Sequence, residues 1–280
     1  MNKTFSRRVK WGSTAVLSAG AVLLIGILII FFQGWYSRSD FEIGRAGRAI
    51  EAAKNNTQRS AAYADRADAY SEKARYLRLI KHVEGEEYSK LFDLAMQDYN
   101  QAIALDPDNT DLFYRRGNAY YSRAGLDMIY APYKSDFLVP AKADFSRVVD
   151  KNPKNAMALD MLGLTEASMK DWTQAISVFE QEAALKPDMR FRVSDAYCNR
   201  GASYPKEKHD LAIADLNRVI QSRDPSDPCE CEPYNPLLAI YLNETQEYDK
   251  AQAVVALAQR SKKWIAPEYL EQLKELSAHQ

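Results

Sequence analysis

The sequence predicts an all-α protein in which pairs of antiparallel helices stack into a solenoid, preceded by a single transmembrane helix. Three observations support this fold class. A nine-residue pattern occurs three times, a pattern of alanine, aromatic residue and proline occurs three times between its copies, and one apolar segment near the N-terminus carries no charge. Short units that repeat because none buries its apolar face alone are typical of helical solenoids.

The nine-residue pattern reads AYADRADAY at 62–70, LFYRRGNAY at 112–120 and AYCNRGASY at 196–204. In each copy an aromatic residue stands three positions before an arginine, a small residue follows the arginine, and a tyrosine closes the set. The small residues, together with a fourth counterpart outside the three copies, are Ala67, Gly117, Gly201 and Gly163. The pattern indicates a recurring structural unit in preference to a recurring active site.

The second pattern places an aromatic residue four positions after an alanine and a proline twelve positions after it. Its three copies are Ala95, Tyr99 and Pro107; Ala141, Phe145 and Pro153; and Ala175, Phe179 and Pro187. Small residues let two helices approach closely, the aromatic side chain fills the space between them, and proline stops the second helix. Each copy therefore predicts the second helix of an antiparallel pair.

In the third unit, the order and spacing of Gly163, Ala175, Phe179 and Pro187 resemble the tetratricopeptide repeat, a helix-turn-helix unit of 34 residues. The resemblance covers residues 60–265 and implies four to five repeats with insertions near 73–94 and 123–139. It also implies capping helices at 36–59 and 266–280. Members of this family are binding scaffolds, so the resemblance implies a protein partner and no catalytic activity.

Residues 13–32 are uncharged and match the length that crosses a bilayer as a helix. Trp35 and Tyr36 suit an interface, so a transmembrane helix is expected over 13–35. A cleaved signal peptide is the alternative, but the apolar run is too long and no small-x-small cleavage pattern follows it. The basic residues within 1–12 predict a cytoplasmic N-terminus, which places the repeats in the periplasm or another extracytoplasmic space.

Composition and motifs disfavour several functions. The 38 acidic residues nearly balance the 37 basic ones, which disfavours a nucleic-acid partner. The three histidines, His82, His209 and His279, are isolated, and no phosphate-binding glycine loop or hydrolase motif is present. We therefore expect no enzyme activity, cofactor or metal.

Two sets of residues are candidates for partner binding. In the family the first helices of the pairs line a concave groove, and the alignment places there Asp68, Asp111, Tyr114, Asn118, Tyr121, Asp160 and Asp195. This surface is aromatic and mildly acidic, which fits either a polypeptide with some basic character or a solvated face. The second set, Tyr130, Tyr133 and Phe137, lies in the insertion at 123–139 and could contact a partner or pack against a neighbouring repeat.

Arginines recur in the nine-residue pattern at Arg66, Arg116 and Arg200. A row of arginines could recognise carboxylates, but packing against the neighbouring helix with a buried stem is the favoured interpretation.

The cysteines are Cys198, Cys229 and Cys231. The loop that holds the last two follows the fourth helix pair and should return near Cys198, so we expect a disulfide from Cys198 to Cys229 or Cys231 in an oxidising compartment. A metal site at the C-x-C sequence is disfavoured because no histidine is nearby.

Together these features predict a membrane-anchored scaffold or adaptor that binds a protein partner during assembly or maturation of an envelope complex. Two alternatives remain open. The chain could be a permanent structural subunit of a larger membrane complex, or it could resemble an organellar import receptor with its repeats in the cytosol.

Overall fold

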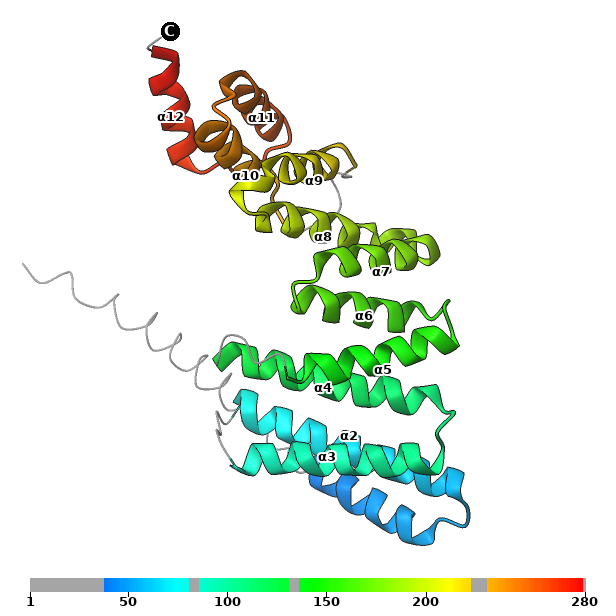
Figure 1. Cartoon of the computed structure of the whole chain (residues 1–280). Helices are drawn as coiled ribbons and strands as arrows, with labels where there is room; N and C mark the ends of the chain where they lie inside the picture. Colours follow the sequence, from blue (N-terminus) through cyan, green and yellow to red (C-terminus); the bar gives the residue numbers. More distant parts are fainter. Residues whose placement is uncertain (1–37, 81–85, 131–135, 223–230, 279–280) are drawn as a thin grey trace, which may run out of the picture. The chain divides into compact units, whose positions relative to one another are not determined.

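The computed structural model describes residues 38–80, 86–130, 136–222 and 231–278, and the regular structure within these ranges is helical (Figure 1). The chain divides into two compact units, residues 1–134 (unit 1) and 135–280 (unit 2). The predicted basic tail at 1–12 and the predicted transmembrane helix at 13–35 lie outside the described residues. Within the described ranges, no helix combines the length and apolar character that a membrane span needs.

Unit 1 contains a helical segment at 38–52, followed by α2 (Asn56–Ile80), α3 (Glu86–Leu105) and α4 (Thr110–Tyr130). Helices α2 and α3 form a closely packed pair, and α4 also packs against α2. The first predicted insertion, 73–94, falls in the second half of α2 and the first half of α3. These two helices are accordingly long, with 25 and 20 residues.

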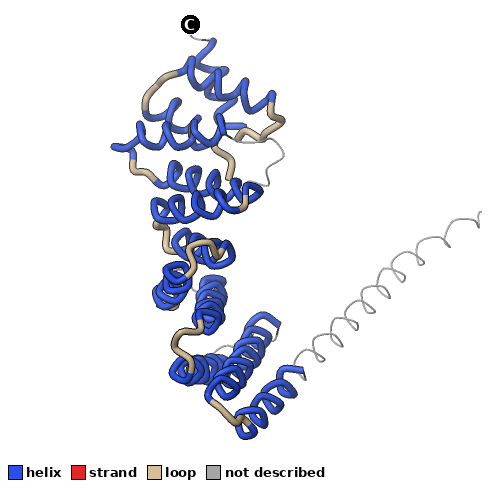
Figure 2. The backbone as a smooth tube through the Cα atoms, turned by 90° about the vertical axis from the view of Figure 1, so that its right-hand side faces the viewer, coloured by secondary structure: helices blue, strands red, loops and turns tan. Residues whose placement is uncertain are grey.

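Unit 2 continues with a series of shorter helices joined by short loops, which Figure 2 shows as tan segments between the blue helices. Helices α6 and α7 form one closely packed pair and α8 and α9 form the next, while α7 also packs against α8. Its elements are α5 (Leu138–Lys151), α6 (Ala156–Ser168), α7 (Trp172–Leu185), α8 (Arg190–Ser203), α9 (His209–Ser222), α10 (Tyr234–Ala239) with a π-helical turn (Ile240–Glu244), α11 (Tyr248–Arg260) and α12 (Pro267–Ala278).

The pair of α6 and α7 shows how the sequence sets the helix ends. Asn155 caps α6 by accepting a hydrogen bond from the backbone N–H of Ala158, and Asp171 caps α7 in the same way for Gln174. Between the two helices Lys170 adopts a left-handed backbone (φ 62°), and its N–H bonds to the carbonyl of Ala167. Pro187 ends the pair because it opens a 3-10 turn after α7.

The second helix of each pair is anchored by an alanine that lies in the core. These anchor alanines are Ala95, Ala141, Ala175, Ala212 and Ala251, and all five are buried. The aromatic residues that follow the first three, Tyr99, Phe145 and Phe179, are buried as well. The alanine-aromatic pattern of the sequence therefore marks the contact between paired helices.

Candidate functional site

The recurring arginines bind carboxylates that belong to the protein itself. Arg66 of α2 donates two hydrogen bonds to Asp98 of α3, at 2.6 and 2.8 Å. Arg200 of α8 pairs with Asp215 of α9 at 2.7 and 2.9 Å. In both cases the hydrogen bonds to the aspartate are the main reason that the arginine pKa is raised.

The aromatic residue three positions before each arginine lies next to its guanidinium group. The guanidinium carbon is 5.6 Å from the ring centre of Tyr63 for Arg66 and 5.2 Å from that of Tyr197 for Arg200. Arg116 has the same relation to Phe113, at 5.6 Å. Arg66 and Arg200 find their acceptor on the following helix, whereas Arg116 of α4 donates to Asn100 of the preceding helix α3 at 2.6 Å. The nine-residue pattern is therefore a packing unit of an aromatic residue, an arginine and an acceptor on a neighbouring helix.

In unit 1 a second ion-pair network engages two residues of the predicted acidic groove. The guanidinium group of Arg115 on α4 faces three aspartates. Its Nη2 atom pairs with Asp68 of α2 and lies 3.0 Å from Oδ1 of Asp65, and its Nη1 atom lies 3.9 Å from Oδ2 of Asp111. The hydroxyl of Tyr99 also donates to Asp68. Burial, followed by the charge of Asp68, raises the pKa of Tyr99, so this phenol stays protonated. Asp68 and Asp111 are thus parts of a network that links α2, α3 and α4.

Three more predicted groove residues, Tyr114, Asn118 and Tyr121, lie on α4 and are half-buried. The insertion residues are described only in part. Phe137 is half-buried at the start of α5, and its carbonyl accepts a hydrogen bond from Ala141. Tyr133 and the side chain of Tyr130 lie outside the described residues.

Unit 2 holds a pocket of about 400 Å³ between the ends of α6, α7 and α8. Leu164, Trp172 and Ala196 contribute apolar wall, while Arg192, Asp195 and Asn199 contribute polar groups. The predicted groove residue Asp195 lies here, and Asp160 is 2.9 Å from the Arg192 Nε in an ion pair. Of the predicted groove residues, Asp195 thus lines this pocket and Asp160 is paired with a residue of its wall.

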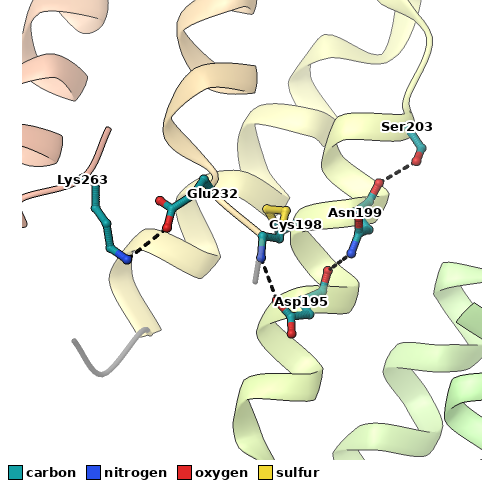
Figure 3. Close-up of a disulfide and its surroundings, with 7 residues drawn as sticks. Asp195, Cys198, Asn199, Ser203, Glu232 and Lys263 are labelled. Carbon is teal, nitrogen blue, oxygen red and sulfur yellow. Dashed lines mark hydrogen bonds and ion pairs between the residues drawn. A yellow bond between two sulfur atoms is a disulfide. The ribbon is translucent and has the colours of Figure 1, made fainter. Parts of the chain in front are cut away.

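A disulfide fixes one side of the pocket. Cys198 of α8 is bonded to Cys231, with their Cα atoms 6.1 Å apart, and Cys231 itself lines the pocket. The backbone N–H of Cys231 donates to Asp195 at 3.0 Å, and Asn199 donates to the carbonyl of Asp195 at 2.8 Å (Figure 3). The segment that begins at Cys231 is thus tied to α8. Cys229, the other predicted partner of Cys198, lies outside the described residues.

Among the described residues, no group of three or more histidine, cysteine and acidic side chains is arranged to hold a metal ion. His209 is exposed to solvent in part and contacts the carbonyl of Lys206 at 3.0 Å. The other two histidines, His82 and His279, lie outside the described residues.

Sequence reasoning did not identify Glu182 of α7, which is fully buried. Within the part of the chain that the structure describes, neither of its carboxylate oxygens has a hydrogen-bond partner. The signal was present in the repeat itself, because Glu182 follows Ala175 by seven positions and each of the other anchor alanines is followed at that distance by alanine or valine.

Residues 92–122, from the middle of α3 to the middle of α4, match the model of the tetratricopeptide repeat family. This stretch of the chain is similar to a tetratricopeptide repeat. Proteins built from such repeats are scaffolds for protein–protein interaction. No curated protein sequence shows significant similarity to the chain.

Solved structures are also similar to this chain. One is the crystal structure of the C-terminal part of a TPR repeat-containing protein from Cytophaga hutchinsonii, with 18% sequence identity and a TM-score of 0.44. The match covers 85% of this chain and 99% of the other.

Proposed function

We propose that this chain is a membrane-anchored tetratricopeptide scaffold that holds a protein partner close to the membrane during assembly or maturation of an envelope complex. The observation that carries the proposal is the pocket of unit 2. Its volume of about 400 Å³ is suited to one or two side chains of a partner polypeptide, and its apolar wall ends in the polar groups of Arg192 and Asn199.

Two features support an extracytoplasmic position for the repeats. The uncharged segment at 13–32 follows a basic stretch, which favours an anchor with a cytoplasmic N-terminus. The disulfide between Cys198 and Cys231 fits the same placement, because disulfides persist in oxidising compartments and are rare in the cytosol. Protease protection of the repeats in intact cells, lost when the outer envelope is opened, is the expected result. If opening the outer envelope leaves the repeats protected, and they are cleaved only after lysis exposes the cytosol, this topology is wrong.

A photo-cross-linking amino acid tests the pocket. Ala167 lines it and is half-buried, whereas Ala214 is exposed on α9 and does not. The cross-linker at position 167 should capture one defined polypeptide, and the matched cross-linker at position 214 should not. The additional substitution Leu164→Arg, which fills the apolar wall with a charged side chain, should abolish the capture. Equal capture from both positions, or capture that survives Leu164→Arg, contradicts binding in the pocket.

The stoichiometry of the captured protein after purification in mild detergent separates the two forms of the proposal. A substoichiometric partner supports an assembly factor. A companion present at a fixed ratio under all conditions supports a permanent structural subunit.

A further inference from the structure

Glu182 occupies a position that is small and apolar in every other described helix pair. The residues seven positions after the other anchor alanines are Ala102, Val148, Val219 and Ala258. All of these side chains, and Glu182 as well, are 0 or 1% exposed. Burying an ionised carboxylate without a partner is costly, so core packing alone does not account for glutamate at this position.

Helices α6 and α8 pack against α7 and surround Glu182 with charged groups. Asp160 faces it from α6 and Arg192 from α8, while Lys186 and Asp188 lie beyond the end of α7. Burial, followed by the like charge of Asp160, raises the pKa of Glu182 to about 7, although the charge of Arg192 acts in the opposite direction. Glu182 therefore exchanges its proton close to neutral pH.

Arg192 connects this carboxyl group with the pocket. Its side chain lines the pocket, and its guanidinium carbon lies 6.0 Å from the ring centre of Phe179. The same guanidinium is paired with Asp160 at 2.9 Å, and Glu182 makes no hydrogen bond to it. This arrangement suits a protonated Glu182, because the neutral carboxyl group does not compete with Asp160 for the arginine.

We propose that Glu182 is a proton-binding switch that sets the position of Arg192 in the wall of the pocket between α6, α7 and α8. When the carboxyl group releases its proton to solvent, a second anion faces Arg192 from α7. The five N–H donors of the guanidinium group can bridge two carboxylates, so the group turns toward α7 and away from the pocket. The charge and shape of the pocket wall then change with pH.

The indole of Trp172, which lines the pocket, reports on this change. In the full-length protein in detergent, replacement of Trp11, Trp35 and Trp264 by phenylalanine leaves Trp172 as the only tryptophan. Its fluorescence should show a titration with a midpoint near pH 7. The substitution Glu182→Gln should abolish this titration. No partner is needed, so the outcome is independent of the cross-linking test of the proposed function.

The direction of the midpoint shift separates a switch from a structural role. Asp160→Asn removes a like charge and should lower the midpoint. Arg192→Gln removes the moving group itself, so it should abolish the fluorescence titration while the carboxyl group of Glu182 still binds its proton. The matched control is Glu166→Gln, because Glu166 is also a buried glutamate but is paired with Lys142 at 2.8 Å. That variant should leave the midpoint unchanged.

A second variant, Glu182→Val, serves the same test if Glu182→Gln does not fold. Valine is suitable because it is the residue at the equivalent positions 148 and 219. The valine variant should fold and lack the titration. In the parent protein, infrared spectra should also contain the carbonyl band of a protonated carboxyl group near neutral pH, absent in both variants. A titration that persists in both Glu182 variants overturns the proposal, as does the absence of any titration in the parent protein.

Discussion

Gly163 of α6 lies directly against the aromatic ring of Phe179 of α7. A Cβ atom at position 163 would lie 2.6 Å from Cδ1 and 2.9 Å from Cζ of that ring, which is closer than two carbon atoms approach without repulsion. Gly201 of α8 has the same relation to Leu216 of α9, at 2.9 Å from its Cγ. The contact between paired helices thus requires a small residue at Gly163 and at Gly201.

The first prediction concerns this contact. Gly163→Ala should lower the free energy of unfolding of unit 2 by about 1–3 kcal/mol, because Phe179 must move from its position in the core. This loss should exceed the gain of about 1 kcal/mol from the higher helix propensity of alanine. Urea denaturation followed by circular dichroism measures the change.

Gly125→Ala provides the matched control for the glycine substitution. Gly125 is also helical, in α4, but no atom lies within 4 Å of the position that its Cβ would take. This variant should be as stable as the parent or more stable, by up to about 1 kcal/mol. If both substitutions stabilise the protein, the position of the Phe179 ring does not require the absence of a side chain at residue 163.

A second prediction concerns the pair of Arg200 and Asp215. The corresponding residues of the α6 and α7 pair are Leu162 and Val178, which are buried, so the chain itself contains an apolar version of this contact. Replacing one partner leaves the other charge unpaired, and Arg200→Leu or Asp215→Val should each cost about 1–3 kcal/mol of stability.

The double variant, Arg200→Leu with Asp215→Val, should be closer to the parent than either single variant, because neither charge is then left without its partner. A double-mutant cycle in urea measures the coupling. Additive losses in the double variant contradict a direct, mutually dependent pair.

The contacts of the two glycines and of the arginine–aspartate pairs also show how far the sequence predicts the structure. The repeat pattern located the paired helices, the anchor alanines and the close contacts at Gly163 and Gly201, because packing of neighbouring helices imposes a fixed spacing. The partners of the arginines were not predicted, since Asp98 and Asp215 lie on the following helix and their pairing depends on the rotation of that helix. The ion pair of Arg115 with Asp68 was not predicted for the same reason, because it joins residues of two different helices.

The pocket illustrates a second limit of sequence reasoning. Asp195 was placed in the groove by the register of its helix, but the wall formed by Trp172 and Cys231 comes from segments distant in sequence. Glu182 was not predicted because the repeat pattern is defined by residues that recur, whereas Glu182 departs from an otherwise apolar position of the repeat.

The third prediction concerns the disulfide of Cys198 with Cys231, which are 33 positions apart in the sequence. Reduction, or the substitution Cys198→Ser, should destabilise unit 2 by about 3–4 kcal/mol, because the cross-link restricts a loop of this length in the unfolded chain. Of the three cysteines, alkylation of the oxidised protein should modify only Cys229. Three reactive thiols in protein isolated without reductant would contradict both the disulfide and the extracytoplasmic placement of the repeats.

The fourth prediction concerns the dependence of stability on pH at Glu182. The pKa of its carboxyl group is about 7 in the folded protein, against an ordinary value of 4.5 that applies to the unfolded chain. Between these two pH values the folded state holds a proton that the unfolded state has lost. The free energy of unfolding should therefore fall as pH rises through this interval, by about 3 kcal/mol from this residue, and should stay at the lower value above pH 7.

Urea denaturation of the parent and of Glu182→Gln, at pH 5 and at pH 8, isolates this contribution, because the other titrating groups are common to both proteins. Relative to the parent, the glutamine variant should become more stable by about 2.5 kcal/mol between the lower and the higher pH. Glu166→Gln should not show this gain, since Glu166 is paired with Lys142 at 2.8 Å, whereas Glu182 makes no ion pair in the described residues. Parallel stability curves for the parent and Glu182→Gln would mean that the carboxyl group of Glu182 does not bind its proton more tightly in the folded state.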